Sequence, residues 1–183
     1  NSMISLSKNT CGVCDSSDLV ELLDLPGLPL TGIFVTEQPE TVQKFDQGLA
    51  MCAECGHAQL KYAVDPEILY DSSYSHRTSV SHTSVAGNEF FAKYFTEVSS
   101  GRAVKNLIDV GCSDLGLLKN LRSVSERLHG IDPIWRNTEA PETPGINVIG
   151  DFVENVNILD EIGVSPDAVI AAHTLEHLNQ PKA

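Results

Sequence analysis

Hydrophobic and polar residues follow two alternating periods along the second half of the chain. Short apolar runs of strand length are separated by longer stretches with helical spacing. This pattern predicts four strands and two helices: strands at 106–110, 128–132, 147–149 and 168–172, and helices at 115–125 and 152–162. Strands that alternate with helices indicate a parallel sheet with right-handed crossovers. The predicted fold class is therefore α/β.

The first 64 residues show only short extended pieces. Strands are predicted at 19–25, 32–35 and 58–64, an extended stretch at 47–51, and a turn of the chain at 26–29, which holds two prolines and a glycine. So few apolar residues make a weak core. A bound metal would supply the missing stability, as small domains often require.

The residues between these two parts have a helical pattern. Asp65 is suited to cap a short helix that begins at Pro66 and ends near Tyr70. A second helix is predicted from about 85 to 98, with a stripe that we expect to pack in the core: Phe90, Phe91, Tyr94, Phe95 and Val98. The chain thus divides into a β unit at 1–64, a helical connector at 65–100 and a parallel-sheet domain at 101–183.

Composition narrows the class of partner. The chain of 183 residues is 42% hydrophobic and carries 12 basic against 25 acidic residues, a formal net charge of −13. Phosphate backbones would repel such a surface, so nucleic acid is not expected as a partner, and a small molecule is. No apolar run approaches the roughly 20 residues of a membrane span, and the first residues do not resemble a signal peptide. We expect a cytoplasmic protein and no membrane partner. Because the chain ends soon after the fourth predicted strand, where an open sheet normally continues, we also expect a piece of a longer protein.

Four cysteines stand in two Cys-x-x-Cys pairs, and they carry the first candidate chemistry. Cys11 and Cys14 form one pair, and Cys52 and Cys55 form the other. Each pair can supply half of a tetrahedral zinc site, so the four together predict a closed structural Zn²⁺ site. The alternatives are two disulfides or four free thiols, and His57 could replace one cysteine. The fifth cysteine, Cys112, is predicted to fill a small space in the core.

The second candidate site follows the first predicted strand. Gly111, Ser113 and Gly116 form a degenerate glycine loop, in which Ser113 and Leu115 stand where further glycines are usual. A glycine there lets the backbone turn close to a nucleotide ligand, and the following helix aims its N–H groups at that ligand. The loop alone resembles a dinucleotide fingerprint as much as a methyl-donor loop.

Residues at the ends of the later strands strengthen this interpretation. Asp132, at the end of the second strand, is placed to accept hydrogen bonds from a ribose diol; the alternative is a helix cap before Pro133. Asp151 and Phe152 could contact an adenine ring, or could be a cap and a core residue. His173, after the fourth strand, lies where a reacting group would sit.

The ordered set of motifs resembles the S-adenosylmethionine-dependent C-methyltransferases that carry an N-terminal zinc-binding domain. The motifs are the two cysteine pairs, the second followed by Gly-His-Ala-Gln-Leu, then the Tyr70–Ser75 segment, the 109–114 loop, Gly-Ile-Asp-Pro at 130–133 and His-Thr-Leu-Glu-His-Leu at 173–178. Characterised members of that family methylate carbon atoms of nucleotide-linked deoxysugars. The resemblance implies a small zinc-binding β domain followed by an incomplete Rossmann-like class I methyltransferase domain.

The resemblance also implies roles for individual residues. The zinc ligands would be Cys11, Cys14, Cys52 and Cys55, and the cofactor S-adenosyl-L-methionine would be bound by Asp109, Gly111, Ser113, Asp132, Pro133, Asp151, Phe152 and His173. Tyr74 and His177 would lie beside a nucleotide-sugar substrate. In the family, the general base comes from a further C-terminal domain, which has no counterpart in these 183 residues.

Two alternatives stay open at this point. One is a nicotinamide-dependent Rossmann protein, which the lack of a clean Gly-x-Gly-x-x-Gly and the presence of the His-Thr-Leu-Glu-His element disfavour. The other is a non-catalytic zinc-ribbon interaction module attached to a degenerate cofactor fold, which the altered glycine loop favours slightly.

Overall fold

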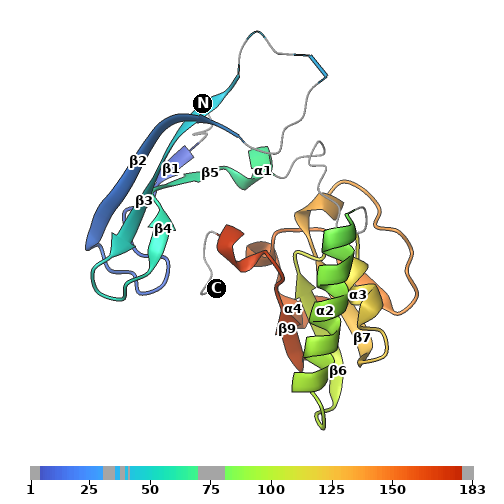
Figure 1. Cartoon of the computed structure of the whole chain (residues 1–183). Coiled ribbons are helices and arrows are strands. Elements are labelled where there is room, and N and C mark those ends of the chain that lie inside the picture. Colours follow the sequence, from blue (N-terminus) through green and yellow to red (C-terminus); the bar gives the residue numbers. More distant parts are fainter. Residues whose placement is uncertain (1–4, 31–35, 38–39, 41, 70–80, 179–183) are drawn as a thin grey trace. The chain divides into compact units, whose positions relative to one another are not determined.

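A computed structural model of the chain describes residues 5–30, 36–37, 40, 42–69 and 81–178 (Figure 1). The chain forms two compact units, one of residues Asn1–Tyr74 with Asn179–Ala183, the other of Ser75–Leu178. Each unit is described by itself below. The domain boundaries after residues 64 and 100 stay predictions. No helix in the described ranges is long and apolar enough to cross a bilayer.

The first unit consists of two small antiparallel sheets. Strands β2 (Leu19–Pro29), β3 (Lys44–Cys52) and β4 (Ala58–Leu60) form a sheet in the order β2-β3-β4, and β1 (Ser5–Ser7) pairs with β5 (Tyr62–Val64). The one-turn helix α1 (Pro66–Leu69) follows. This arrangement confirms the small β domain predicted for the N-terminal part.

Two details of this unit correct the sequence predictions. The turn expected at 26–29 is wrong, because β2 continues to Pro29 opposite Lys44. A register shift between Leu25 and Leu28 accommodates Pro26, and Pro29 is the last residue of this edge strand. The single strand expected at 58–64 is broken at Lys61, after which the chain pairs with β1 instead of β3. The strand predicted at 32–35 lies outside the described residues.

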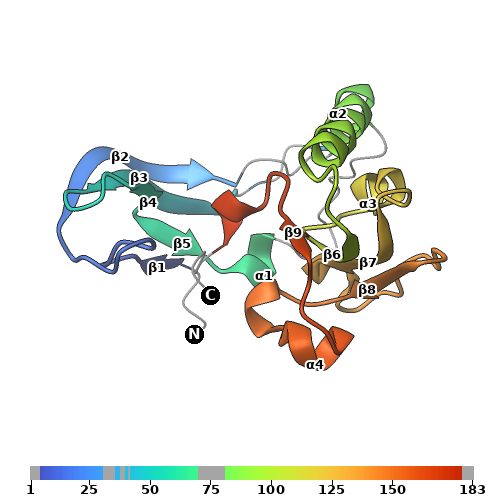
Figure 2. The same ribbon diagram turned by 90° about the horizontal axis from the view of Figure 1, so that it is seen from below.

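The second unit is a parallel four-stranded sheet with helices on both faces (Figure 2). Its strands are β6 (Val104–Val110), β7 (Ser125–Ile131), β8 (Ile146–Ile149) and β9 (Ala168–Ile170), in the order β8-β7-β6-β9. Helices α2 (His82–Val98) and α3 (Gly116–Asn120) cover one face and α4 (Ile158–Ile162) the other. The predicted α/β class with a parallel, Rossmann-like sheet is confirmed.

The strand order places a switch point at the end of β6. The chain leaves β6 for β7 on one side and later returns to β9 on the other side. In open parallel sheets such a point opens a crevice outside the carboxyl ends of the strands, where ligands bind. The loops that follow β6, β7, β8 and β9 therefore hold the candidate site of this unit.

Apolar residues form a separate core on each face of the sheet. Leu107, Leu118 and Leu121 are completely buried beneath α2 and α3, and Cys112 lies in the same cluster, as predicted. On the opposite face Ile108 and Ile131 pack with residues of α4. Both cores hold the β6 and β7 backbones rigidly, which is what a loop-built site at their ends requires.

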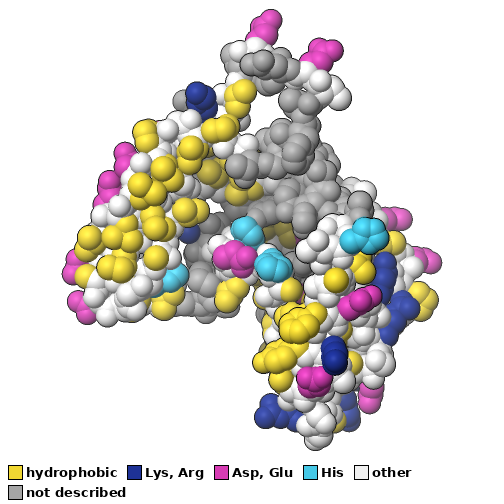
Figure 3. Space-filling view, viewed as in Figure 1, with side chains coloured by type: hydrophobic (Ala, Val, Ile, Leu, Met, Phe, Trp, Pro, Cys, Tyr) yellow, Lys and Arg dark blue, Asp and Glu magenta, His cyan; other side chains and the backbone are white. Residues whose placement is uncertain are grey.

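The helices are shorter or more exposed than the sequence predicted. The helix expected at 115–125 ends at Asn120, and the one expected at 152–162 is a 3-10 turn at Val153–Asn155 followed by α4. In α2, Phe91 and Phe95 pack on the core, but the prediction that the whole stripe is buried is wrong: Phe90 is 72% exposed, and Tyr94 and Val98 are also exposed. Figure 3 shows hydrophobic side chains on the surface of this unit. A helix with one neighbouring layer buries only one narrow face.

Candidate functional site

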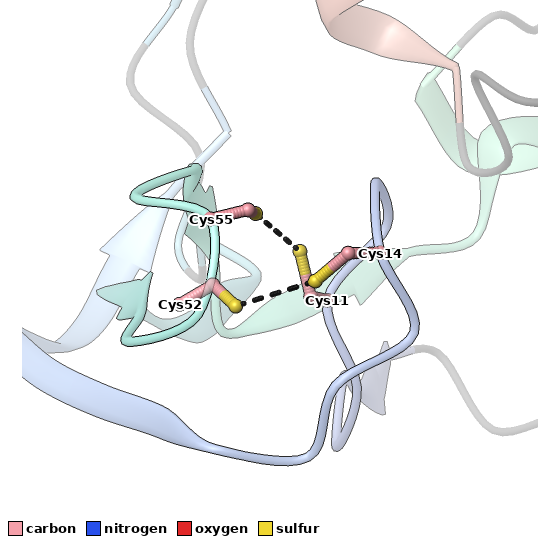
Figure 4. A group of neighbouring side chains, drawn as sticks. All are labelled: Cys11, Cys14, Cys52 and Cys55. Atoms are coloured by element: carbon pink, nitrogen blue, oxygen red, sulfur yellow. Dashed lines mark hydrogen bonds between the residues drawn. The ribbon is translucent and has the colours of Figure 1, made fainter.

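The four cysteines of the two pairs converge in the first unit (Figure 4). All four Sγ atoms lie within 4.8 Å of one another. The Sγ atoms of Cys11 and Cys55 are 3.7 Å apart, and those of Cys14 and Cys52 are 3.5 Å apart. Four sulfurs around one zinc ion at about 2.3 Å would be about 3.8 Å apart, so the cluster fits tetrahedral Zn²⁺. His57 is not part of this group among the described residues.

Both cysteine pairs adopt the same local turn. The N–H of Asp15 donates to the carbonyl of Cys11 at 3.0 Å, and the N–H of Gly56 donates to that of Cys52 at 2.9 Å. The residue after each second cysteine is left-handed, with φ of 61° at Asp15 and 73° at Gly56. Asp and Gly tolerate that conformation better than most residues.

The turns prepare two of the thiols for deprotonation. The N–H of Cys14 is the main group that lowers the pKa of Cys11, to about 7. The N–H of Cys55 is the main group that lowers the pKa of Cys52. Cys11 and Cys52 are also the two buried members of the cluster. Thiolate is the form that binds zinc, so the local backbone favours the ligand state at these two positions. Burial and contacts with the neighbouring cysteines raise the pKa of Cys14 and of Cys55.

Gln59 holds the first turn against β4 and was not identified from the sequence as a site residue. Its Oε1 accepts from the N–H of Gly12 at 2.8 Å, and its Nε2 donates to the carbonyl of Thr10 at 2.9 Å. Gln59 is buried, which is uncommon for a glutamine without a partner. A buried side-chain amide can join two segments that are distant in sequence. Only its position in the Cys-Gly-His-Ala-Gln-Leu motif signals it.

In the second unit, the loop after β6 has the conformation of a glycine loop without all of its glycines. Gly111, Ser113 and Leu115 have φ of 79°, 46° and 66°. The sequence departs from glycine at Ser113 and Leu115, yet the backbone keeps the left-handed turn there. Non-glycine residues in this region cost about 1–2 kcal/mol each and tend to cluster at functional sites.

Asp132 faces this loop from the end of β7. Its Oδ2 accepts from the N–H of Ser113 at 2.7 Å, and its Oδ1 accepts from the N–H of Ile134 at 3.0 Å. The second bond caps the 3-10 turn Pro133–Trp135, which confirms the cap alternative, and the ribose role stays a prediction. A carboxylate has about four lone-pair positions, so two N–H groups orient it without ending its capacity to accept.

Trp135 also joins the loop after β6 to the loop after β7. Its indole N–H donates to the carbonyl of Ser113 at 2.8 Å. Trp135 is the only tryptophan of the chain, and sequence reasoning did not single it out. The Ser113 peptide is thus held on both sides by residues that follow β7.

Asp151 and Phe152 lie together after β8, with Arg136 beside them. Asp151 Oδ1 accepts from the N–H of Phe152 at 2.8 Å and is 3.8 Å from Nε of Arg136. The Arg136 guanidinium lies 5.7 Å from the centre of the Phe152 ring. These contacts join the loop after β8 to the loop after β7.

The segment after β9 brings the two predicted histidines to the same end of the sheet. His173 is exposed, with a left-handed φ of 55°. His177 is exposed too and lies in a 3-10 turn, 4.0 Å from Glu176. Tyr74, the other predicted catalytic residue, lies outside the described residues.

Asp109 is the most deeply buried charged residue near the site. It is 2% exposed, and its Oδ1 has no hydrogen-bond partner among the described residues. Burial, followed by the charge of Asp132, raises the pKa of Asp109 to about 8. A buried carboxyl oxygen without a partner, one residue before the end of β6, is consistent with a polar ligand at this point.

The chain is therefore an α/β protein with a Cys₄ zinc-binding unit and a Rossmann-like sheet. Residues 11–70, which include all four cysteines, match a family model that is named for methyltransferases and described as "Putative zinc binding domain". No curated protein matches the chain.

Among solved structures, the chain is similar to that of the plantazolicin methyltransferase BpumL in complex with SAH. The sequences are 18% identical, the TM-score is 0.39, and the match covers 51% of this chain and 37% of that chain. This chain therefore matches little more than a third of that protein's length, and a likeness at this level carries no weight for ligand or activity.

Proposed function

We propose that this chain is the N-terminal part of an S-adenosylmethionine-dependent C-methyltransferase. The proposed substrate is a nucleotide-linked keto-deoxysugar, and the zinc ion is structural. The observation that carries the proposal is the bond from the Ser113 N–H to Asp132 at 2.7 Å, because it joins the glycine turn to the residue placed for a ribose diol. The match of residues 11–70 to a zinc-binding domain named for methyltransferases supports the same class.

Different residues of the second unit are assigned to different parts of the ligand. We assign the ribose to Asp132 and Pro133, the adenine to Asp151 and Phe152, and the methionine part to the loop and strand ends: Asp109, Gly111, Ser113 and His173. Asp109 has the buried, unpartnered oxygen that a polar group of the methionine part would satisfy. Both Asp132 and Asp151 already accept backbone N–H groups, so their carboxylates are oriented before ligand binds.

The chemistry requires an acidic carbon on the substrate side. S-adenosylmethionine, when bound, supplies an electrophilic methyl group and is left as S-adenosylhomocysteine. The carbon next to the substrate's keto group gives its proton to a general base and takes the methyl group in exchange. We assign Tyr74 and His177 to the substrate side, where the exposed His177 can hold a proton or a hydrogen bond, and leave the base itself unassigned.

The test is direct binding of the cofactor to the purified chain. Trp135 lies at the proposed pocket, so its fluorescence should change on titration with S-adenosylhomocysteine or S-adenosylmethionine, and calorimetry should give the same affinity. Asp132→Asn should weaken binding by about tenfold or more, because a charge-assisted hydrogen bond contributes roughly 1.5–3 kcal/mol. The matched control is Asp160→Asn, an exposed carboxylate in the first turn of α4.

Three outcomes separate the alternatives. Binding of NAD and not of S-adenosylmethionine would replace the proposal with a nicotinamide-dependent protein. Binding of neither ligand by a folded, zinc-loaded chain would favour a non-catalytic interaction module. An equal loss of affinity in Asp132→Asn and Asp160→Asn would remove the assigned ribose site.

A further inference from the structure

Gly111 is in contact with the segment after β9, not only with its own loop. A Cβ atom built at Gly111 would lie 2.1 Å from Oγ1, 2.8 Å from Cγ2 and 3.0 Å from Cβ of Thr174. All three nearest atoms belong to one side chain. The space that a side chain at position 111 would need is therefore filled by Thr174.

This contact links the loops that follow β6 and β9 at the switch point. The two strands are neighbours in the sheet, and their last paired residues are Asp109 and Ile170. Beyond that pair, no ladder bond holds the two loops together among the described residues. The Thr174 side chain bridges this gap by packing on Gly111, and its Oγ1 donates to the carbonyl of Ala172 at 3.3 Å.

The residue before Thr174 has a left-handed backbone. His173 directly precedes Thr174 and is held at φ 55°, a conformation that a non-glycine residue adopts at a cost. The N–H of His177 donates to the Thr174 carbonyl at 2.8 Å, so the turn at 175–177 starts from the same residue. Thr174 is thus next to His173 in the chain and bonded to His177 through its carbonyl.

We propose that Thr174 is a positioning residue for the cofactor pocket, and that Gly111 is glycine so that Thr174 can seat on it. This proposal rests on the proposed function and deepens it. Sequence reasoning gave Gly111 a different role, to leave room for the ligand's own close approach. The two roles make opposite predictions for a pair of substitutions.

The experiment is a double-mutant cycle of Gly111→Ala and Thr174→Gly in the full chain. Binding of S-adenosylhomocysteine is followed through Trp135 fluorescence, and thermal unfolding is measured in parallel. Gly111→Ala should weaken binding by about tenfold, because its Cβ atom would clash with the Thr174 side chain and displace it. Thr174→Gly removes all three clashing atoms. It should weaken binding less than Gly111→Ala does, and the double variant should bind as well as Thr174→Gly alone and better than Gly111→Ala.

A second glycine serves as the control for the strain of an alanine in a left-handed backbone. Gly145 has φ 78°, close to the 79° of Gly111, and a Cβ atom there would meet nothing within 4 Å. Gly145→Ala carries the same left-handed strain without the neighbour, so it should lower thermal stability but leave affinity unchanged. Thr174→Ser, which keeps Oγ1, should bind more tightly than Thr174→Gly.

The outcomes are distinguishable from failure of the proposed function. If the double variant binds no better than Gly111→Ala, the alanine methyl blocks the ligand itself and the proposal is wrong. If the wild-type chain binds no S-adenosylhomocysteine, the proposed function fails, but the cycle is still read from thermal unfolding. Absence of coupling between the two substitutions in that measurement would overturn the contact's role.

Discussion

At the scale of single residues, Asp109 lowers the stability of the fold and lies at the candidate site. It is 2% exposed and has one oxygen without a hydrogen-bond partner among the described residues. The nearby charge of Asp132 helps to raise its pKa. A carboxyl group in such a place is unfavourable when ionised. Proteins retain such groups where a ligand or a reaction uses them.

The raised pKa makes a prediction about stability against pH. An unfolded aspartate titrates near 3.9, and Asp109 in the folded chain titrates at about 8. Between these values the folded state holds a proton that the unfolded state has lost, so this contribution to stability falls as pH rises towards 8 and is lost above it. Asp109→Asn should remove this fall, and its free energy of unfolding should exceed the wild-type value by more at pH 8 than at pH 5.

Asp167 is the control for this measurement. N–H groups of Asn106 and then Lys105 lower the pKa of Asp167, so its contribution is present at neutral pH and lost on acidification. Asp167→Asn should therefore destabilise the chain at pH 7 and less so at low pH, the reverse of Asp109→Asn. Urea denaturation from pH 3 to pH 9 measures both. Parallel profiles for wild type and Asp109→Asn would show that Asp109 does not carry the effect.

At the scale of elements, β4 acts as the support of the first cysteine turn. Gln59 extends from β4 to the backbone of Thr10 and Gly12, on either side of Cys11. Gln47, on β3, is a second glutamine whose Oε1 and Nε2 bond to the backbone of Tyr62, away from the cysteines. The two residues make similar bonds, but only Gln59 bonds to the neighbours of a cysteine.

This pair gives a matched test of the support. Gln59→Leu removes the bonds to the Gly12 N–H and the Thr10 carbonyl, at about 0.5–1.5 kcal/mol each, so it should speed zinc release to a chelator. Gln47→Leu should lower the stability of the unit but leave zinc release close to the wild-type rate. A colorimetric chelator assay measures the rates. Equal acceleration in both variants would mean that general destabilisation, and not the turn, controls metal retention.

Helix α2 shows the limit of element-level reasoning. Its apolar residues have helical spacing, and the helix forms as expected. Spacing alone does not say how wide a face the neighbouring layer covers. Phe91 and Phe95 point to the core, while Phe90 and Tyr94 stay exposed on a helix whose neighbours include α3.

At the scale of the whole molecule, the two units differ in what stabilises them. The second unit has two apolar cores, one on each face of its sheet. In the first unit, most of β2 is exposed. Two of the most buried side chains of this unit are the cysteines Cys11 and Cys52. Metal ligation therefore replaces part of the apolar core there.

Chelation of zinc should therefore unfold one unit and spare the other. Trp135 lies in the second unit, so its emission should not change when the metal is removed, whereas hydrogen-exchange protection of β3 should be lost. Cys14→Ser should reproduce this loss. Cys112→Ala, outside the cluster, should leave zinc content unchanged. Retained protection of β3 in metal-free protein would show that the first unit folds without zinc.

The sequence alone determined the features that depend on local order along the chain. Strand and helix periods predicted the parallel sheet, and the spacing of Cys11, Cys14, Cys52 and Cys55 predicted the cluster, because both patterns are properties of short segments. The glycine loop was also visible, although Ser113 and Leu115 replace glycines in it.

Only the tertiary structure decided which distant residues meet. The packing of Thr174 on Gly111, the bonds of Gln59 around Cys11, and the link from Trp135 to Ser113 each join segments separated by 20 residues or more. The exposure of Phe90 and the shortened helix before β7 depend in the same way on neighbouring layers. Such contacts follow from the path of the chain through the sheet, which no local pattern contains.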